Sequence, residues 1–222
     1  MSIRIGYLLP TRERVMAEQP QAAPLLELAE RAERLGFDSV WAGDSLLARP
    51  RHEPLTLLAA VASRVRRVDI GTAVLLPALR NPVLLAHQVA TLDQVAEGRL
   101  ILGVGIAADV PNIRQEFTAA GVPFEKRVGR LLEGLRLARS LWSGKSVDWD
   151  GRWKVEHGIL GPTPYRQGGP RSGSADRCPQ ASIASVASSK AGCRSRRMLT
   201  NGLAYGTRSR KSHARRGAIR TR

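Results

Sequence analysis

Residues 71–105 read GTAVLLPALRNPVLLAHQVATLDQVAEGRLILGVG and contain the end of one strand, a complete helix and a second strand. The mostly apolar run Val68–Pro77 leads into this stretch, and the run Arg99–Ile106 ends it. Between them, Asn81–Gly98 opens with a cap residue and a first-turn proline and closes on a glycine, which is typical of a helix. Apolar strands on either side of a helix are typical of a parallel sheet that is covered on both faces.

The same alternation of strand and helix extends on both sides of this stretch. Apolar runs that end in turn residues predict further strands, and apolar residues at helical spacing predict the helices. The expected strands are Ile3–Pro10 and Asp38–Ser45, and the expected helices are Pro24–Phe37, Glu53–Val65 and the long Pro123–Gly144. Four alternations with short connections predict an α/β fold, either a TIM (β/α)8 barrel or a doubly wound sheet.

In both folds ligands bind at the carboxyl ends of the parallel strands, so functional side chains are expected there. The residues at these ends suggest no metal cluster and no Ser-His-Asp set; they are Pro10, Thr11, Gly43, Asp44, Ser45, Leu76, Pro77, Gly103, Gly105 and Ile106. The run GVGIAA from Gly103 matches a dinucleotide fingerprint only in part, and it follows the fourth strand instead of the first. The motif alone therefore favours close packing over ligand binding as the reason for Gly103 and Gly105.

Positive charge is concentrated after Pro170. Residues 171–222 hold thirteen of the 35 Lys and Arg residues and one of the 19 acids, which gives +12 of the formal net charge of +16. Both cysteines, Cys178 and Cys193, lie there too, and without further ligands at a set spacing they predict neither a disulfide scaffold nor a metal site. With neither a signal peptide nor an apolar run of bilayer length, the sequence predicts a cytoplasmic protein without a membrane partner.

Four segments resemble the bacterial luciferase-like (LLM class) flavin-dependent oxidoreductases and monooxygenases. Gly71–Gly105 resembles the central signature of that family, Phe37–Ser45 its second strand, Gly121–Gly144 its long fourth helix, and Gly161–Pro170 the run before its fifth strand. The resemblance implies a TIM (β/α)8 barrel that uses FMN or a deazaflavin coenzyme (8-hydroxy-5-deazaflavin) for monooxygenation or hydride transfer. It also implies a small-molecule substrate, and it is compatible with a flavin reductase as partner and with a homo-oligomer.

The resemblance further implies where the cofactor ring lies. The ring is expected over the carboxyl ends of the first four strands, near a non-proline cis peptide at Ala73–Val74. Ser45 stands where several relatives have a proton-handling histidine, and a serine without an adjacent base is a poor general base. The resemblance assigns no catalytic residue here, and the expected cofactor-binding residues are Asp44, Ala73, Val74, Gly105 and Ile106. The residues by themselves leave open that Ala73 and Val74 are strand core and that Asp44 is a helix cap.

The segment after Pro170 departs from the family, whose members continue with a strand of the form Pro-Ile-Trp-Ile-Gly-Gly. If the gene is read one base earlier, the codons of Pro170–Asp176 are compatible with that strand, and those of Lys190–Arg194 with Glu-Gly-Trp-Leu-Pro. We therefore expect a luciferase-like partial barrel in residues 1–170 and an unpatterned basic tail, frameshifted or disordered, in residues 171–222. A non-enzymatic protein whose basic arm binds nucleic acid ranks last, because Tyr205 is the one aromatic residue after Pro170 for base stacking.

A barrel that stops after about four βα units lacks half of the strands that this fold requires. In the family, the residues that hold the cofactor phosphate come largely from the fifth strand onward. The sequence thus predicts a truncated and impaired product that does not retain FMN or the deazaflavin coenzyme.

Overall fold

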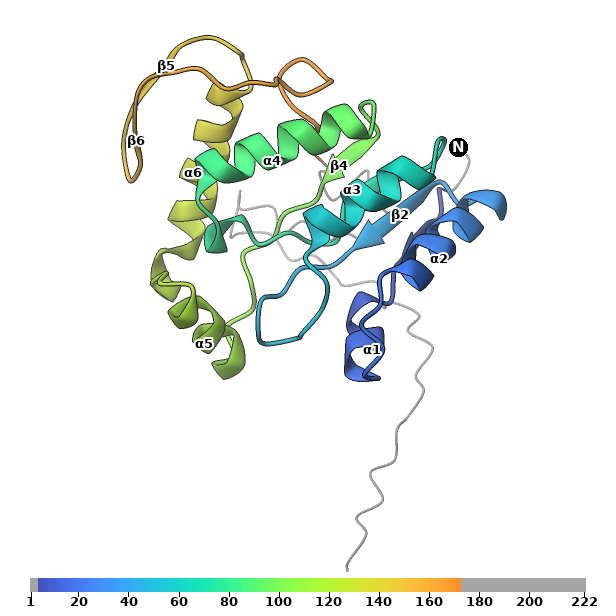
Figure 1. Ribbon diagram of the computed structural model, residues 1–222. Coiled ribbons are helices and arrows are strands. Elements are labelled where there is room, and N and C mark those ends of the chain that lie inside the picture. Colours follow the sequence, from blue (N-terminus) through green and yellow to red (C-terminus); the bar gives the residue numbers. More distant parts are fainter. Residues whose placement is uncertain (1–3, 173–222) are drawn as a thin grey trace, which may run out of the picture. The chain divides into compact units, whose positions relative to one another are not determined.

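A computed structural model describes residues 4–172 of the protein, and its main feature is a five-stranded parallel sheet. The strand order is β1-β2-β3-β4-β7, and each neighbouring pair is parallel (Figure 1). The strands are β1 (Gly6–Leu8), β2 (Ser39–Ala42), β3 (Asp69–Thr72), β4 (Leu100–Leu102) and β7 (Arg171–Ser172). The predicted α/β fold is confirmed, as is the sequential parallel order of the first four strands.

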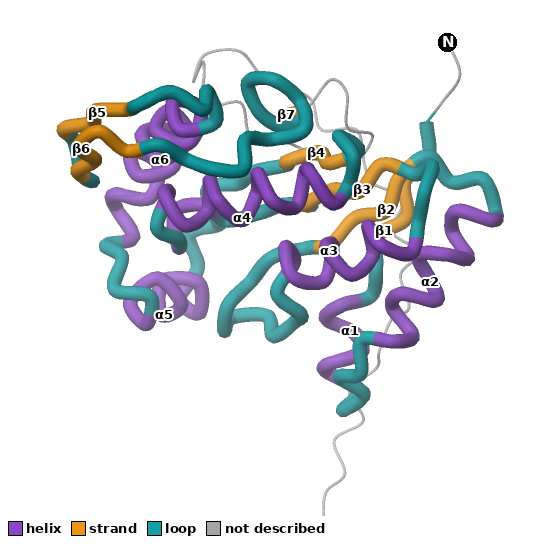
Figure 2. Tube along the Cα trace, turned by 45° about the horizontal axis from the view of Figure 1, so that its top comes forward, coloured by secondary structure: helices purple, strands orange, loops and turns teal. Residues whose placement is uncertain are grey.

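Three helices cover one face of this sheet: α2 (Ala23–Arg34), α3 (Pro54–Arg64) and α4 (Pro82–Val95) (Figure 2). The strand side chains that pack among them are fully buried; they are Val40, Ile70 and Leu100. Because the side chains of a strand alternate between the two faces, the neighbouring residue Trp41 lies on the opposite face. The helix-covered face is therefore the hydrophobic core, and the opposite face is the one that lines the interior of a barrel.

The helix starts follow the capping signals in the sequence. The Asn81 side chain accepts hydrogen bonds from the amides of Val83 (2.9 Å) and Leu84 (3.4 Å), and Pro82 occupies the first turn of α4. At α3 the carboxylate of Glu53 accepts from the amide of Thr56 at 2.7 Å. These contacts satisfy backbone donors that have no partner inside the helix.

Several elements were not predicted from the sequence. The helix expected over Pro123–Gly144 consists of the 3-10 turn η2 (Phe124–Lys126) followed by α6 (Arg127–Leu141). The short helices α1 (Thr11–Met16) and α5 (Pro111–Ala119) and the 3-10 turn η1 (Pro77–Leu79) follow strand ends. These segments are too short to show a helical period clearly, which is why the sequence pattern did not identify them.

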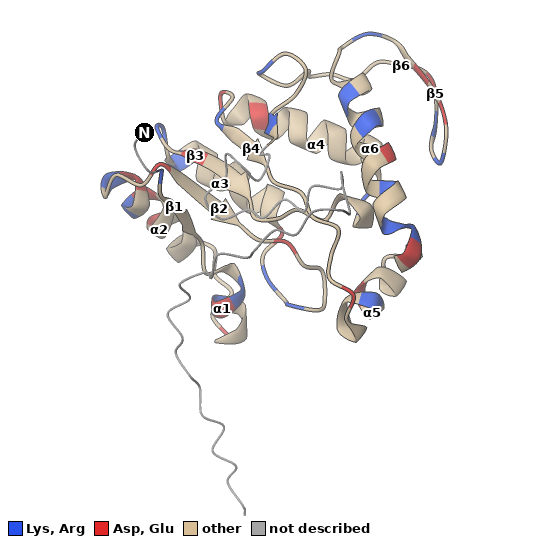
Figure 3. Ribbon diagram, turned by 180° about the vertical axis from the view of Figure 1, so that it is seen from behind, with Lys and Arg blue, Asp and Glu red and all other residues tan. Residues whose placement is uncertain are grey.

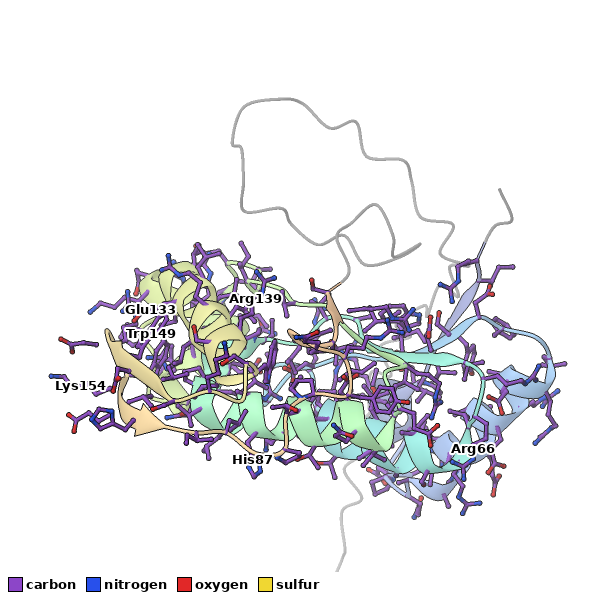
Figure 4. All side chains as sticks on the ribbon, turned by 90° about the horizontal axis from the view of Figure 1, so that it is seen from above. Arg66, His87, Glu133, Arg139, Trp149 and Lys154 are labelled. Atoms are coloured by element: carbon purple, nitrogen blue, oxygen red, sulfur yellow. The ribbon has the colours of Figure 1, made fainter. Side chains whose placement is uncertain are left out.

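A two-stranded antiparallel hairpin, β5 (Val147–Asp150) and β6 (Lys154–Gly158), lies outside the main sheet. It is tied to α6 by Glu133, whose carboxylate accepts from the Arg152 amide at 2.6 Å and pairs with the Arg152 Nε at 2.9 Å. Figure 4 shows Glu133 on α6 at the same end of the molecule as Trp149 and Lys154 of the hairpin. The hairpin is thus attached to α6 and adds no strand to the parallel sheet.

The first two residues of the expected basic tail form a strand at the fifth position of the sheet. Arg171 and Ser172 pair in parallel with Ile101 and Leu102 of β4. The Arg171 guanidinium donates to the carboxylate of Asp69 and to the carbonyl of Arg99 (3.3 Å). Arg171 and Ser172 therefore belong to the sheet, and the division of the chain into residues 1–170 and 171–222 remains a prediction. Residues 173–222, to which the frameshift and basic-tail expectations apply, lie outside the described part of the chain.

The loop before β7 is held to α4 by Asp93, which is fully buried. One carboxylate oxygen accepts from the Arg166 amide at 3.1 Å, and the other has no hydrogen-bond partner among the described residues. Burial raises the pKa of Asp93, and the backbone hydrogen bond and charge of Arg166 only partly offset this effect. Asp93 therefore binds a proton more tightly in the folded than in the unfolded chain.

Asp93→Asn is expected to flatten the pH dependence of stability on the acidic side of neutrality. In the native chain, the proton linkage of Asp93 adds stability that is fully present below its ordinary pKa of 3.8 and is lost as the pH rises through its raised folded-state value. Asparagine can keep the carbonyl that accepts from the Arg166 amide but does not titrate. Urea unfolding of both proteins between about pH 4 and pH 7 measures the difference. Equal slopes in both proteins would contradict a raised pKa.

Charged residues lie mainly on the helices and the hairpin, while the central strands carry few of them (Figure 3). Basic and acidic side chains are mixed along α2 and α6, as on an ordinary solvated surface. Among residues 4–172, no helix has both the length and the apolar character needed to cross a bilayer.

Candidate functional site

The carboxyl ends of β2, β3 and β4 meet at one edge of the sheet and bring the predicted site segments together. The Ala73 amide donates to the Ala42 carbonyl, and the Leu75 amide to the Gly103 carbonyl, both at 2.8 Å. The Gly105 amide in turn donates to the Leu75 carbonyl at 2.8 Å. The peptide bond between Ala73 and Val74 is cis, as the resemblance implied.

Two glycines at this edge are closely packed against their neighbours. A Cβ on Gly103 would overlap the carbonyl oxygen of Thr72, whose hydroxyl donates to the Gly103 carbonyl at 2.7 Å. A Cβ on Gly105 would lie 2.5 Å from Cγ2 of Val74. The close-packing explanation of both glycines therefore fits the geometry. The neighbouring residues Ala73, Val74 and Ile106 are half-buried, so the edge presents small and apolar side chains that are partly exposed.

Trp41 forms a floor on the inner face of the sheet. Its indole nitrogen donates to the Ser39 hydroxyl at 2.8 Å, and its ring lies against both Gly6 and Gly71, where a Cβ would collide with it. Ala73, Val74 and Ile101 pack against Trp41. The two glycines lie on β1 and β3, the strands on either side of β2, and they make room for the Trp41 indole across three strands.

Asp44 is buried in an ion pair and caps no helix. Its two carboxylate oxygens accept from the guanidinium of Arg80 at 2.5 and 3.0 Å, and one also accepts from the Leu76 amide at 2.8 Å. Arg80 also reaches Glu53 at 3.1 Å. Burial acts to lower the pKa of Arg80, but the hydrogen bonds and charges of Asp44 and Glu53 outweigh it and raise the pKa. Asp44 thus holds the connection after β3 in place, and the helix-cap alternative is wrong because Glu53 caps the next helix, α3.

Ser45 is engaged with a buried acid that the sequence analysis missed. Its hydroxyl donates to the carboxylate of Glu116 at 3.2 Å and accepts from the Arg49 amide at 3.0 Å. Glu116 is 1% exposed and also accepts from the amides of Leu46 and Ala48. The Ser45 hydroxyl therefore holds its own loop: its proton is donated to Glu116 and its oxygen binds the Arg49 amide.

A signal for Glu116 does exist in the sequence. Ile113, Glu116 and Phe117 have the spacing of one helix face, and all three are buried in α5. An acid in an apolar stripe is an exception, because carboxylates are rarely buried without a partner. The stripe was too short to be recognised, so its acid was not considered.

Histidine and metal ligands are not gathered at this edge. Within residues 4–172, no group of three or more His, Cys, Asp or Glu side chains is arranged to hold a metal ion. His52 contacts the Pro20 carbonyl through Nε2 at 2.7 Å, and His87 points away from the sheet on the outer surface of α4 (Figure 4). What the edge offers is a partly exposed apolar shelf formed by Ala73, Val74 and Ile106, which fits a flat aromatic cofactor better than a metal.

Residues 3–192 match the model of the protein family described as Luciferase-like monooxygenase. The match extends past Pro170, where the sequence resemblance ended. An F420-dependent glucose-6-phosphate dehydrogenase of Kribbella flavida is 40% identical over 160 residues, and one of Amycolatopsis mediterranei is 38% identical over 159. These alignments cover 68% and 67% of the chain but 45% and 44% of the relatives. The chain thus spans a little under half the length of the curated relatives that it matches.

Two solved structures support the same assignment of fold. The monooxygenase RslO1 from Streptomyces bottropensis superposes with a TM-score of 0.66 at 30% identity, covering 77% of this chain and 52% of that one. An F420-dependent secondary alcohol dehydrogenase, solved with an F420-acetone adduct, gives a TM-score of 0.61 at 27% identity, covering 74% of this chain and 50% of that one. In each case about half of the other chain has a counterpart here.

Proposed function

Because the chain belongs to the luciferase-like monooxygenase family, we propose that residues 4–172 carry the ring shelf of a flavin- or deazaflavin-dependent oxidoreductase. The observation that supports this most directly is the half-buried edge formed by Ala73, Val74, Gly105 and Ile106. Val74 packs closely on Gly105, and Trp41 packs against Ala73 and Val74 from the inner face. Small apolar residues of this kind suit a planar ring, and they offer no ligand for a metal or a phosphate.

We assign roles to the predicted site residues on this basis. Ala73 and Val74 lie beneath the ring, and Gly105 and Ile106 border it on the β4 side. Asp44 acts as a positioning residue, because its carboxylate is held by Arg80 and the Leu76 amide. No described residue is assigned as the proton-transfer group, since the Ser45 hydroxyl is bound to Glu116.

The deazaflavin coenzyme is the better candidate of the two cofactors. The curated relatives quoted above are named as F420-dependent, and so is one of the two structural neighbours. Bound at the shelf, such a coenzyme supplies or accepts a hydride. This chain's contribution is to keep the ring flat and to exclude water from the face that rests on Ala73 and Val74. Flavin monooxygenation is the second candidate, favoured by the 30% identity to the monooxygenase RslO1.

The chain covers a little under half the length of the curated relatives quoted above. We propose that residues 4–172 form a partial barrel and that the gene changes reading frame soon after Pro170. The test of the frame is the nucleotide sequence across codons 168–200. A shifted frame that stays open for some hundred codons supports the proposal, and a shifted frame with an early stop codon contradicts it.

The 222-residue chain is expected to show no measurable binding of FMN or deazaflavin, and the frame-restored protein is expected to bind. The phosphate of a flavin is held by several charge-assisted hydrogen bonds, worth roughly 1.5–3 kcal/mol each, and losing them weakens binding by orders of magnitude. Titrating both cofactors against both proteins by fluorescence measures this. Micromolar binding by the 222-residue chain would show that a partial barrel suffices.

The shelf suits a small organic molecule as substrate. We propose that the frame-restored enzyme acts in the cytoplasm, with a flavin reductase as partner if it uses FMN, and that it forms a homo-oligomer. Nucleic acid is not proposed as a partner, because basic and acidic side chains are mixed on the described surface.

A further inference from the structure

Arg51 lies at the proposed shelf, although no sequence pattern pointed to it. Its guanidinium rests on Gly43, where a Cβ would collide with Nη1. The same Cβ position is 3.4 Å from the carbonyl oxygen of Ala73. The guanidinium and the first residue of the cis peptide therefore border one point at the end of β2, and only glycine at position 43 allows this arrangement.

The charge of Arg51 has no carboxylate in contact. Among residues 4–172, Arg51 makes no ion pair, and its single hydrogen bond runs from Nε to the Arg49 carbonyl at 3.3 Å. Asp44, which lies at the shelf, is already paired with Arg80. The two terminal nitrogens of Arg51, with four N–H groups, thus have no acceptor in the described part of the chain, and their fork suits a planar or tetrahedral oxyanion.

The surroundings of Arg51 disfavour an isolated positive charge, which makes a bound anion more favourable. Burial lowers the pKa of Arg51, and the charges of Arg12 and Arg49 lower it further, while Glu13 and Asp44 act against this. Arg12 follows β1 and Arg49 follows β2, so both approach from the same edge of the sheet. A half-buried cation among other cations is costly unless an anion joins it.

We propose that Arg51 binds an oxyanion, a phosphate or carboxylate group of the substrate that lies over Ala73 and Val74. The inference rests on the proposed function for the position of the substrate, and it adds that the substrate is anionic. Arg51 would then select the substrate by its charge, on the β2 side of the shelf and apart from the cofactor phosphate, whose ligands come largely from later strands in the family.

Titration of the isotope-labelled 222-residue chain with inorganic phosphate, and separately with acetate, tests the proposal at constant ionic strength. The NMR signals of the Arg51 Nε–H and of the Gly43 and Ala73 amides are expected to shift along a saturating curve. In Arg51→Gln the Gly43 and Ala73 shifts should need at least about tenfold more phosphate, as the loss of a charge-assisted bond predicts. Arg31→Gln removes the same charge from an exposed position on α2 that does not contact Arg51; it serves as the matched control and should respond like the native chain.

A second variant separates the position of the guanidinium from its charge. Gly43→Ala keeps Arg51 but fills the place where it rests, so phosphate affinity is expected to fall while the backbone signals outside the loop stay unchanged. Shifts that do not saturate, or an Arg51→Gln protein that responds as the native chain does, would overturn the proposal. Because no cofactor is added, this result is independent of the cofactor titration, and either proposal can fail without the other.

Discussion

Gly103→Ala is expected to lower the free energy of unfolding by about 3 kcal/mol, the upper end of the usual cost of overpacking. The new methyl group would overlap the carbonyl oxygen of Thr72, and a backbone atom in a central strand cannot rotate away as a side chain can. The Thr72 hydroxyl bond to the Gly103 carbonyl would be strained at the same time. Denaturant unfolding followed by circular dichroism measures the loss.

Gly129→Ala provides a control of opposite sign. Gly129 is exposed on α6, and a Cβ there would approach only the mobile end of the Arg152 side chain, at 3.1 Å. Alanine in a helix interior is favoured over glycine by about 0.5–1 kcal/mol, so this variant should be slightly more stable than the native chain. If both variants changed stability by the same amount, close approach at Gly103 would not be the cause.

Glu116→Ala is expected to cost about 3 kcal/mol and to loosen the loop after β2. The carboxylate accepts hydrogen bonds from the Ser45 hydroxyl and from the amides of Leu46 and Ala48. Each buried donor that is left without a partner costs about 1–3 kcal/mol. Hydrogen exchange of the Leu46 and Ala48 amides gives a local readout, and both should exchange faster. Unchanged protection of these two amides would show that the loop holds itself without Glu116.

Glu116→Gln tests whether the negative charge matters beyond the geometry. Glutamine keeps the length of the side chain and one acceptor oxygen, so it can still bind one side of the loop. We expect it to lose about 1 kcal/mol, less than alanine, because hydrogen bonds to a neutral acceptor are weaker than those to a carboxylate. A loss equal to that of alanine would mean that every contact of Glu116 depends on its charge.

The sequence predicted the parts of the fold that repeat. The strands around Val40, Ile70 and Leu100 are mostly apolar runs, and the helices between them start at cap residues, so both follow from local chemistry. The meeting of Ala73–Val74 with Gly105 followed from the family resemblance, since nothing in a short apolar strand indicates a cis peptide. The alternating strands and helices, and the cis peptide that the family shares, could therefore be predicted.

The contacts that shape the candidate site could not be predicted in this way. Asp44 pairs with Arg80 and Ser45 with Glu116, and these partners are 36 and 71 residues apart in the chain. In the sequence nothing distinguishes Arg51 from other loop arginines, and its position against Gly43 is seen only in the fold. Such pairs depend on which elements become neighbours in space, and hydrophobic periodicity carries no information about individual polar partners.

The register of the sheet has a consequence for the order in which the chain folds. From β1 to β4, each strand pairs with one about 30 residues away, as Ser39 does with Asp69, so three successive loop closures of similar size build the sheet. Arg171 instead pairs with Ile101, about 70 residues earlier. Closing a loop of twice the length costs roughly 0.6 kcal/mol more in chain entropy, and two residues of β7 belong to the described part of the chain. We therefore expect the fifth strand to dock last and to detach first, and the four strands before it to form as one cooperative unit.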